Sequence, residues 1–580
     1  MSKSYQVIRP SQFITTFGPG SVVETPSGPV VLKSMDALFT SLHRQPHEFE
    51  IIDERLSKGI LDGARISRIP TNAEVGQATE TWIYPTDGFP FWALCAQHPN
   101  YQILYQIGAG CPECGKMPDW QRRQKGGREA IRFVTACQAG HLDEVPWQSL
   151  VHAQSKPCGT RHYRWYGGGR ALRLVRIECP KCKASVNFGT AYGRQWKCSG
   201  RRPEHGGRPD QSTCSQPASI VQRGSANLRI AELVTALTIL DMRVRLHDVL
   251  GSRELLARID VLLEGDLLTH DTLLAQAKKC GISPDDIEHL ARTPWPDIRS
   301  AVDQLLDVQP TGPNAVRDAE LDRLRDAATN GAPVGEHSTG PASPPLFEVK
   351  QVDVRSVTGP NGRMTFRVTP VSRLRMVMVQ TGYRRLNPET GHIIPTSFLD
   401  RGITWYPGVE LFGEGIFIDL GDAPLVVEGQ RVLPWQRLHM SGDPMDLTNH
   451  PTHVWWHSLS HRLLWALSVD SGYSSAAIRE RVYVRVEDNN VINSGLLLYT
   501  VQPGGDGTMG GLISLVNRFE RVLERALRDV DTCSNDPLCD EAPGSGADGA
   551  ACYSCLFVSE TSCEHRNHGL DRLLLTENLP

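Results

Sequence analysis

The sequence predicts a multidomain α+β protein with zinc-ribbon-like modules in its N-terminal half, a helical middle segment, and a C-terminal α/β domain with a four-cysteine zinc site. Three observations support this prediction. A chain of 580 residues is too long for one hydrophobic core. Its cysteines recur in CxxC pairs, the spacing that two adjacent corners of a tetrahedral zinc site require. Short β-like runs surround one long stretch of helical periodicity.

Composition and periodicity divide the chain into five predicted segments. Residues 1–90 carry short apolar runs broken by Gly and Pro, which predicts a β-rich domain. The others are a basic zinc-binding module (91–225), helices followed by a linker (226–346), a second β-rich region (347–430), and a zinc-binding C-terminal domain (431–580).

Local patterns predict individual elements within these segments. We expect strands near residues 21–24, 30–32, 415–420 and 495–501, and helices over 253–263, 453–469 and from a Gly-rich loop at 504–511 to about 530. Ser283 followed by Pro284 is typical of a helix N-cap with proline at the first helical position. Residues 327–345 are rich in Gly, Pro, Ser and Thr, which predicts a flexible linker or a surface excursion.

The net charge of −4 conceals an uneven distribution. Between Cys111 and Ile230 there are 21 Lys and Arg residues but only 8 Asp and Glu residues. The remainder of the chain is therefore acidic. A basic excess in the cysteine-rich segment predicts a surface for nucleic-acid phosphates. The alternative is a solvated basic face with no ligand.

The sequence also indicates a compartment. The first ten residues lack an apolar signal region, and no apolar stretch approaches the ~20 residues of a membrane span. We therefore expect a cytoplasmic protein that does not contact a membrane. In a reducing cytoplasm, cysteine clusters indicate metal sites rather than disulfides.

The first predicted zinc site consists of Cys95, His98, Cys111 and Cys114, because two ligand pairs of matched spacing are typical of a zinc ribbon. A competing grouping joins Cys111 and Cys114 to residues of a different pair, Cys137 and His141.

A second site is predicted from Cys179, Cys182, Cys198 and Cys214, four cysteines with no surplus. A third grouping combines residues of suitable ligand type but irregular spacing: Cys137, His141, His152 and Cys158. The alternative is that these two cysteines are small buried apolar residues and that His152 lies at the surface.

The C-terminal region offers five thiols for one tetrahedral site. We expect Cys539, Cys552, Cys555 and Cys563 to bind zinc; the alternative is that Cys533 is a ligand in place of one of them. Cys280 stands alone in a helical stretch and is expected in a core. Each of these sites has four protein ligands and no open position, so we expect two to four structural zinc ions per chain.

Several longer motifs resemble a known family. They are RPSQFITTFGPGS (9–21), FVTACQAGHLDEVPW (133–147) and QRGSAN (222–227). The C-terminal third adds HSLSH (457–461), SGYSS (471–475), DGTMGG (506–511), CSNDPLC (533–539) and the segment from GAAC (549–552) to Cys563. These stretches resemble the DrmB family, subunits of the bacterial DISARM anti-phage defence system. The C-terminal third is also similar to the zinc-binding C-terminal domain of Mrf-type helicases. One departure is His98, which stands where the family pattern has a cysteine.

The resemblance implies a protein that works with a partner, a DrmA-like helicase, on DNA. The sequence contains no GxxxxGK[ST] loop, so the ATPase is expected in the partner and this chain is expected to be non-catalytic. We expect DNA phosphates to be bound by basic residues of the zinc module, namely Arg122, Arg123, Lys125, Arg201, Arg202 and Arg208. The alternative is that this surface contacts an acidic face of the helicase.

Two rival functions remain. One is a metal-dependent nuclease that uses His457 and His461, four apart on a helix, with Glu480 or Asp506. Against it, the motif lacks the glutamate of HExxH, and such histidines more often make buried hydrogen bonds. The other is a purely structural subunit that binds the helicase without touching DNA.

Overall fold

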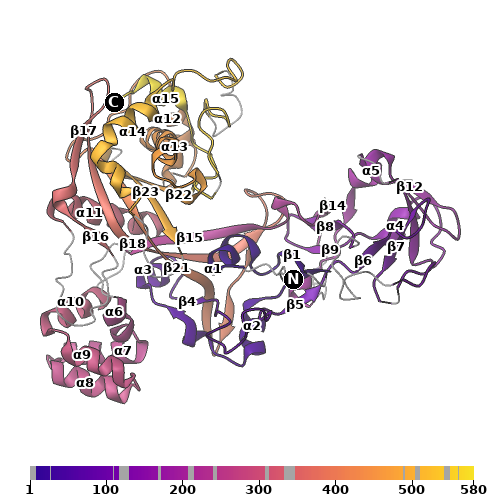
Figure 1. Cartoon of the computed structure of the whole chain (residues 1–580), viewed down its shortest axis with the longest axis horizontal. Coiled ribbons are helices and arrows are strands. Elements are labelled where there is room, and N and C mark those ends of the chain that lie inside the picture. Colours follow the sequence, from indigo (N-terminus) through magenta and orange to yellow (C-terminus); the bar gives the residue numbers. More distant parts are fainter. Residues whose placement is uncertain are drawn as a thin grey trace. The chain divides into compact units, whose positions relative to one another are not determined.

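The computed structural model describes residues 8–25, 28–108, 110–116, 130–167, 171–206, 214–238, 244–306, 312–331, 347–443, 445–487, 490–502, 510–540, 549–559 and 561–580. Strands gather into several separate sheets and helices form groups of their own, so the predicted α+β class is confirmed (Figure 1). The chain forms two compact units. Unit 1 comprises Met1–Ile51, Ala64–Val234 and Met378–Val409, and unit 2 comprises Ile52–Gly63, Thr235–Val377 and Glu410–Pro580.

Unit 1 opens with short elements and a three-stranded sheet. The sheet has the order β1-β2-β5, and the predicted strands near 21–24 and 30–32 are its first two members. Its strands are β1 (Val22–Thr25), β2 (Gly28–Leu32) and β5 (Thr86–Gly88). The other early elements are α1 (Pro10–Gln12), η1 (Phe13–Phe17), α2 (Met35–Leu42), η2 (Pro46–Phe49), β3 (Glu50–Ile51) and β4 (Arg65–Arg68).

The cysteine-rich segment of unit 1 forms two further sheets. The five-stranded sheet has the order β12-β11-β10-β7-β6, with β6 (Trp92–Cys95), β7 (Gln102–Gln106), β10 (His162–Tyr166), β11 (Arg176–Glu178) and β12 (Ser185–Asn187). The four-stranded sheet has the order β13-β14-β8-β9, with β8 (Phe133–Cys137), β9 (Leu142–Glu144), β13 (Gln195–Lys197) and β14 (Pro217–Gln222).

One aromatic core serves both sheets of this segment. Phe133 of the four-stranded sheet contacts Phe188 at a ring distance of 4.7 Å, and Trp165 of the five-stranded sheet contacts the same ring at 5.1 Å. Short helices complete this core: α4 (Trp147–Val151), η5 (Leu172–Leu174) and α5 (Phe188–Tyr192). The segment also contains η6 (Pro203–His205) and η7 (Ala226–Leu228). The strands are only three to six residues long, and loops make up much of the segment. This one core is therefore small relative to the number of residues that it has to stabilise.

Three long strands contribute residues to both units: β15 (Ile230–Thr238), β18 (Thr365–Arg384) and β21 (Ile403–Asp419). In unit 2, β21 pairs antiparallel with β23 (Asn490–Gln502), which forms a hairpin with β22 (Ile478–Glu487). These strands contain the predicted runs at 415–420 and 495–501. Shorter strands flank the long ones: β16 (Glu348–Val349), β17 (Arg355–Thr358), β19 (Ile394–Pro395) and β20 (Phe398–Asp400), with η8 at Gln351–Asp353.

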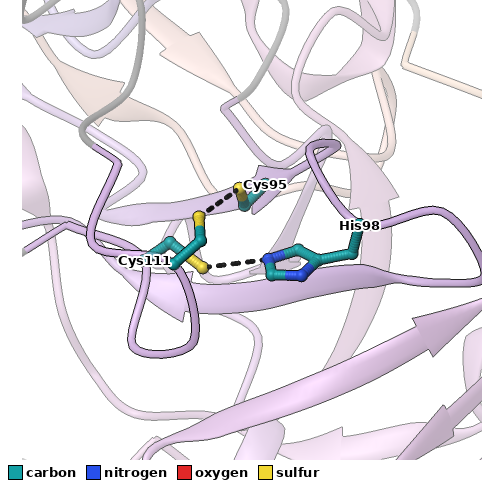
Figure 2. Close-up of side chains that lie close together, drawn as sticks. Cys95, His98 and Cys111 are labelled. Atoms are coloured by element: carbon teal, nitrogen blue, oxygen red, sulfur yellow. Dashed lines mark hydrogen bonds between the residues drawn. The ribbon is translucent and has the colours of Figure 1, made fainter.

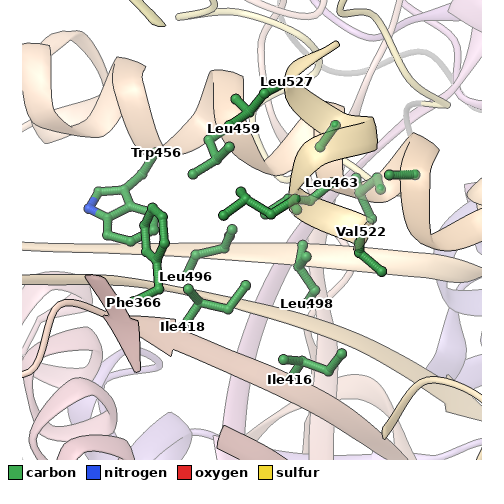
Figure 3. Packing of buried hydrophobic residues seen from close by; sticks show 14 of the residues in the cluster. Phe366, Ile416, Ile418, Trp456, Leu459, Leu463, Leu496, Leu498, Val522 and Leu527 are labelled. Atoms are coloured by element: carbon green, nitrogen blue, oxygen red, sulfur yellow. The ribbon is translucent and has the colours of Figure 1, made fainter. Parts of the chain in front are cut away.

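Helix α13 (Pro451–Asp470) forms the centre of the core of unit 2, in agreement with the helix predicted over 453–469. Figure 3 shows its side chains Trp456, Leu459 and Leu463 packed against residues of the sheet and of α14 (Phe519–Leu527), namely Phe366, Ile416, Ile418, Leu496, Leu498, Val522 and Leu527. The helix is buried on almost every side, and its buried residues include polar ones, among them His457 and His461, as well as apolar ones. Neighbouring elements are α12 (Val432–Ser441), η9 (Leu447–Asn449), η10 (Ser475–Ala477), η11 (Ile513–Arg518) and α15 (Arg572–Glu577).

The side chains of consecutive residues of β22 point to opposite faces of the strand, as in any β-strand. Arg481 donates from Nε to Oε2 of Glu320, 2.7 Å away on α11 (Pro313–Asn330). Glu480, the preceding residue, instead contacts His457 of α13.

The predicted helical segment has its own core, formed by α6 (Val244–Leu250), α7 (Arg253–Glu264), α8 (His270–Lys279), α9 (Pro284–Arg292) and α10 (Trp295–Leu306). The N-cap predicted at Ser283 is confirmed, because its side chain accepts a hydrogen bond from the N–H of Asp286. Unit 2 also contains α3 (Glu54–Gly59).

Two predicted boundaries are wrong. The first four residues of the expected linker continue α11 to Asn330, because Ala327 and Ala328 are buried apolar residues of that helix; residues 332–346 lie outside the described ranges. The helix expected to reach about residue 530 ends at Leu527, and its first part is the 3-10 helix η11.

Candidate metal centres

Cluster 1 consists of Cys95, His98, Cys111 and Cys114, the four residues predicted as the first site. Cys95 ends β6, and a turn carries the CxxC pair, where the N–H of Cys111 donates to the carbonyl of Lys116. The Sγ atoms of Cys95 and Cys114 lie 3.7 Å apart, and Nε2 of His98 lies 3.3 Å from Sγ of Cys111 (Figure 2). Tetrahedral zinc with bonds of about 2.0–2.3 Å holds its ligands at such separations.

Cluster 2 consists of Cys137, His141, Cys198 and Cys214. Cys137 and His141 flank the turn of the β8–β9 hairpin, and the two other cysteines flank β13 and β14. From Sγ of Cys137 the distances are 3.4 Å to Nδ1 of His141, 3.5 Å to Sγ of Cys198 and 4.0 Å to Sγ of Cys214. Three cysteines and a histidine at these distances fit a closed zinc site.

Cluster 3 consists of His152, Cys158, Cys179 and Cys182. Nε2 of His152 lies 3.5 Å from Sγ of Cys158 and 3.3 Å from Sγ of Cys182, and the Sγ atoms of Cys158 and Cys179 are 3.3 Å apart. The other ring nitrogen of His152 lies 2.9 Å from the carbonyl oxygen of Gln148. Such a hydrogen bond fixes the tautomer that presents Nε2 to a metal.

Cluster 4 consists of Cys533, Cys539, Cys552 and Cys555. The Sγ–Sγ distances are 3.5 Å between Cys533 and Cys552, 3.7 Å between Cys539 and Cys555, and 3.8 Å within the CxxC pair. The N–H of Ser554 also points at Sγ of Cys552, as in a thiolate-binding turn. These four thiols fit a closed zinc site with cysteine ligands only.

The groupings differ from those predicted in two places. The structure separates the expected four-cysteine set: the CxxC pair at 179–182 joins His152 and Cys158, while Cys198 and Cys214 join Cys137 and His141. The expected third set is accordingly divided between clusters 2 and 3. The physical reason is that the sheet pairing, and not the sequence interval, decides which hairpin ends meet. Cys137 and Cys198 come together because β14 lies between their strands in the four-stranded sheet.

The second difference concerns the C-terminal thiols. Cys533, the alternative ligand, belongs to cluster 4, and Cys563, expected as a ligand there, lies elsewhere. The sequence intervals did not distinguish which of the five thiols is spare. Cys280, expected in a core, packs half-buried against the helices of its segment.

The pKa values of the thiols indicate how readily the clusters ionise when no cation is bound. Burial raises the pKa of Cys95 to about 12, that of Cys198 to about 12 and that of Cys539 to about 11. In cluster 3 the hydrogen bonds from Thr160 instead lower the pKa of Cys158 to about 5. The thiols whose pKa burial raises are therefore costly to ionise, and a divalent cation removes that cost by binding them as thiolates.

Cluster 5 lies in the core of unit 2 and consists of His457, His461, Glu480 and Cys563. All four side chains are buried, with exposed fractions of 0, 1, 1 and 5%. Burial opposes the charge on Glu480, but the neighbouring histidines hold its pKa well below the usual range. Burial and the Glu480 charge raise the pKa of the Cys563 thiol. The sequence analysis grouped the two histidines with Glu480 but not with Cys563. The sequence signal for Cys563 was that the C-terminal region has one thiol more than a four-ligand site needs.

The residues predicted to bind DNA are described only in part. Arg122, Arg123, Lys125 and Arg208 lie outside the described ranges, as does Asp506 of the nuclease hypothesis. Arg201 is exposed, and its Nε lies 3.8 Å from a carboxylate oxygen of Asp143. Arg202 is half-buried.

No helix in the described ranges combines the length and apolar character that crossing a bilayer would demand.

Comparisons with known proteins match both ends of the chain. The family described as "Domain of unknown function (DUF8724)" matches residues 9–230, which include clusters 1 to 3. The family described as "MrfA Zn-binding domain" matches residues 459–556, which include cluster 4. The C-terminal domain is thus similar to a zinc-binding domain, as predicted.

A curated relative, "DISARM protein DrmB" of Bacillus paralicheniformis (strain ATCC 9945a / NCIMB 11709 / CD-2), is 26% identical over 539 residues, which cover 85% of this chain and 89% of that protein. The resemblance predicted from the short motifs is therefore confirmed. A solved structure of the DUF1998 helicase MrfA bound to DNA aligns with 37% of this chain and 23% of that chain at 14% identity. Its TM-score is 0.21, which is too low to support an argument.

Proposed function

We propose that this chain is a non-catalytic, zinc-stabilised subunit of a DISARM-like bacterial defence system that binds DNA and acts as a scaffold for a DrmA-like helicase. The similarity to DISARM protein DrmB extends over most of both chains, which supports a role in the same kind of system. The absence of a GxxxxGK[ST] loop from the sequence supports a separate motor subunit.

The basic surface of the zinc module carries the DNA-binding part of the proposal. Between residues 111 and 230 the described chain contains fifteen Lys and Arg residues and five Asp and Glu residues. Eleven of the fifteen are exposed: Lys116, Arg132, Lys156, Arg161, Arg173, Arg176, Lys181, Lys183, Arg194, Lys197 and Arg201. A surface of this composition attracts phosphate groups without selecting a base sequence.

The few acidic groups of the same region do little to offset this charge. Glu204 is fully buried against Arg385. Burial raises the pKa of Glu144 to about 8, so this carboxyl is mostly neutral at pH 7. Glu113 and Glu178 each form an ion pair with an arginine of the five-stranded sheet. The exposed cations therefore dominate the local potential.

Clusters 1 to 4 supply the scaffold in this proposal. Each contributes four protein ligands and leaves no open position, which suits structural rather than catalytic zinc. In the segment of residues 91–225, strands of three to six residues depend on such cross-links because their shared aromatic core is small.

The rival nuclease hypothesis has less support. Its histidines, His457 and His461, lie in the core of unit 2 with at most 1% of their surface exposed. A hydrolytic metal needs an open coordination position that water and a phosphodiester can reach. Incubation of the purified chain with DNA and Mg²⁺ or Mn²⁺ tests this alternative, since cleavage that disappears in His457→Ala would establish it.

A salt-titrated gel shift of the purified full chain tests DNA binding. We expect binding at low salt. The logarithm of the affinity should fall linearly with the logarithm of the salt concentration, because each phosphate contact releases counterions. Binding that is absent at low salt would leave only the structural role. Co-purification with the DrmA-like helicase of the same system tests the scaffolding part separately, and failure to form a complex would contradict it.

A further inference from the structure

We propose that His457, His461, Glu480 and Cys563 form a fifth, closed zinc site in the core of unit 2, in addition to clusters 1 to 4. The residues come from three parts of the fold: two from α13, one from β22, and one from the segment after the last CxxC pair. Their ligand atoms all lie within 4.8 Å of one another. Two of them, His457 and Cys563, lie outside the residues that match the zinc-binding family.

Hydrogen bonding on the far side of each imidazole fixes its tautomer. Nδ1 of His457 lies 3.1 Å from the carbonyl oxygen of Gly569, and Nδ1 of His461 lies 2.8 Å from that of Leu556. A carbonyl can only accept, so both Nδ1 atoms carry the proton. Each neutral ring then presents the lone pair of Nε2 to the cluster, the arrangement that hydrogen-bonded carbonyls impose on zinc-binding histidines.

Both Nε2 atoms face an oxygen of the Glu480 carboxylate, which can only accept, and that of His457 also faces the Cys563 sulfur. Nε2 of His457 lies 2.8 Å from Oε1 of Glu480 and 3.2 Å from Sγ of Cys563, and Nε2 of His461 lies 3.2 Å from the same Oε1. A nitrogen lone pair and the carboxylate that it faces repel each other unless a cation lies between them. Two imidazolium protons would leave a net positive charge in a fully buried site, which is costly. Zn²⁺ with one carboxylate and one thiolate is neutral.

The remaining atoms of the ligands are also held in place. The N–H of Asn567 lies 3.2 Å from Sγ of Cys563, and Ser460 donates to the second oxygen of Glu480. Asn567 in turn bonds through its side chain to both backbone groups of Val558, which ties the turn to the segment after cluster 4. Two imidazoles, a thiolate and a carboxylate suit zinc.

Zinc counting by native mass spectrometry of the full chain tests this site. We expect Cys563→Ser to lower the zinc count by one, Cys555→Ser to lower it by one through cluster 4, and the double variant to lower it by two. Cys280→Ser is the matched control, since Cys280 is the one cysteine outside the five clusters, and should change nothing.

Several outcomes would overturn the proposal. One is an unchanged count in Cys563→Ser, and another is a double variant that loses only one zinc, which would put Cys563 in cluster 4. If Cys563→Ser does not fold, Glu480→Gln provides the same test with the thiol intact, and a zinc-edge anomalous map of wild-type crystals provides another. A density peak among the four side chains supports the site, and its absence contradicts it. None of these results depends on DNA binding.

Discussion

In unit 1, Nη2 of Arg385 lies 3.1 Å from Oε1 of Glu204, and both side chains are fully buried. The guanidinium also donates to three backbone carbonyls, those of Gly20, Gly140 and Leu228. One arginine thus joins the end of β18 to the residue Gly20 ahead of β1, to the turn of cluster 2, to η6 and to η7. A buried charge whose three nitrogens all donate to fixed partners is stable only while those partners remain.

Removal of this arginine should therefore destabilise the protein strongly. We expect Arg385→Ala to lower the free energy of unfolding by about 3–5 kcal/mol, because the Glu204 carboxylate is left buried without its cation. Urea unfolding measured by fluorescence provides the test. Arg201→Ala, which removes an exposed pair at 3.8 Å, is the control and should cost at most about 1 kcal/mol. Equal effects of the two variants would contradict this explanation.

Glu144 predicts a pH effect of known sign. Its pKa is raised to about 8 by burial in the folded chain, whereas an unfolded glutamate ionises near a pH of about 4.3. Between these values the folded state holds a proton that the unfolded state has released, so the stability of the wild type falls as pH rises. Glu144→Gln removes that dependence. Calorimetry at about pH 6 and about pH 8 should show the variant gaining relative to wild type at the higher pH, and a constant difference in Tm would refute the assignment.

The division of the N-terminal ligands into clusters 2 and 3 can be tested by zinc counting. Cys179→Ser and Cys198→Ser should each lose one zinc, and the double variant should lose two, because the structure places these thiols in different clusters. If both belonged to one four-cysteine site, as their sequence intervals predict, the double variant would lose only one.

The salt dependence of DNA binding should identify the contact surface. Replacing the exposed Arg173 and Arg194 together by Ala should weaken binding and reduce the slope of log K against log salt by about 0.9 for each phosphate that the variant no longer neutralises. The matched control replaces Arg292 and Arg299, which are exposed on α9 and α10 outside the zinc module. A larger loss of affinity in the control would move the DNA site away from the module.

The fold class and many elements could be predicted from the sequence, because local signals determine them. Short apolar runs marked β2 and β23, and the serine–proline pair marked the start of α9. The end of α11 was missed because Ala327 and Ala328, at the edge of a Gly- and Pro-rich stretch, are held helical by burial. Burial of that kind depends on tertiary contacts that composition does not reveal.

The sequence predicted which residues are metal ligands more completely than it predicted which of them share a cluster. Nearly every Cys and His of clusters 1 to 4 was named, since CxxC turns are local. Their grouping depends on strand order: β14 lies between β8 and β13, which brings Cys137 to Cys198 across a gap of 61 positions. Cluster 5 was harder still, because Cys563 reaches His457 only through the packing of the C-terminal segment on α13.

Native mass spectrometry before and after chelation, combined with limited proteolysis, tests the central claim most directly. We predict at least four zinc ions per chain, five if cluster 5 is filled, and cleavage within residues 91–225 once the metal is removed. A chain with fewer than four zinc ions, or a metal-free chain that resists the protease as the native one does, would contradict it.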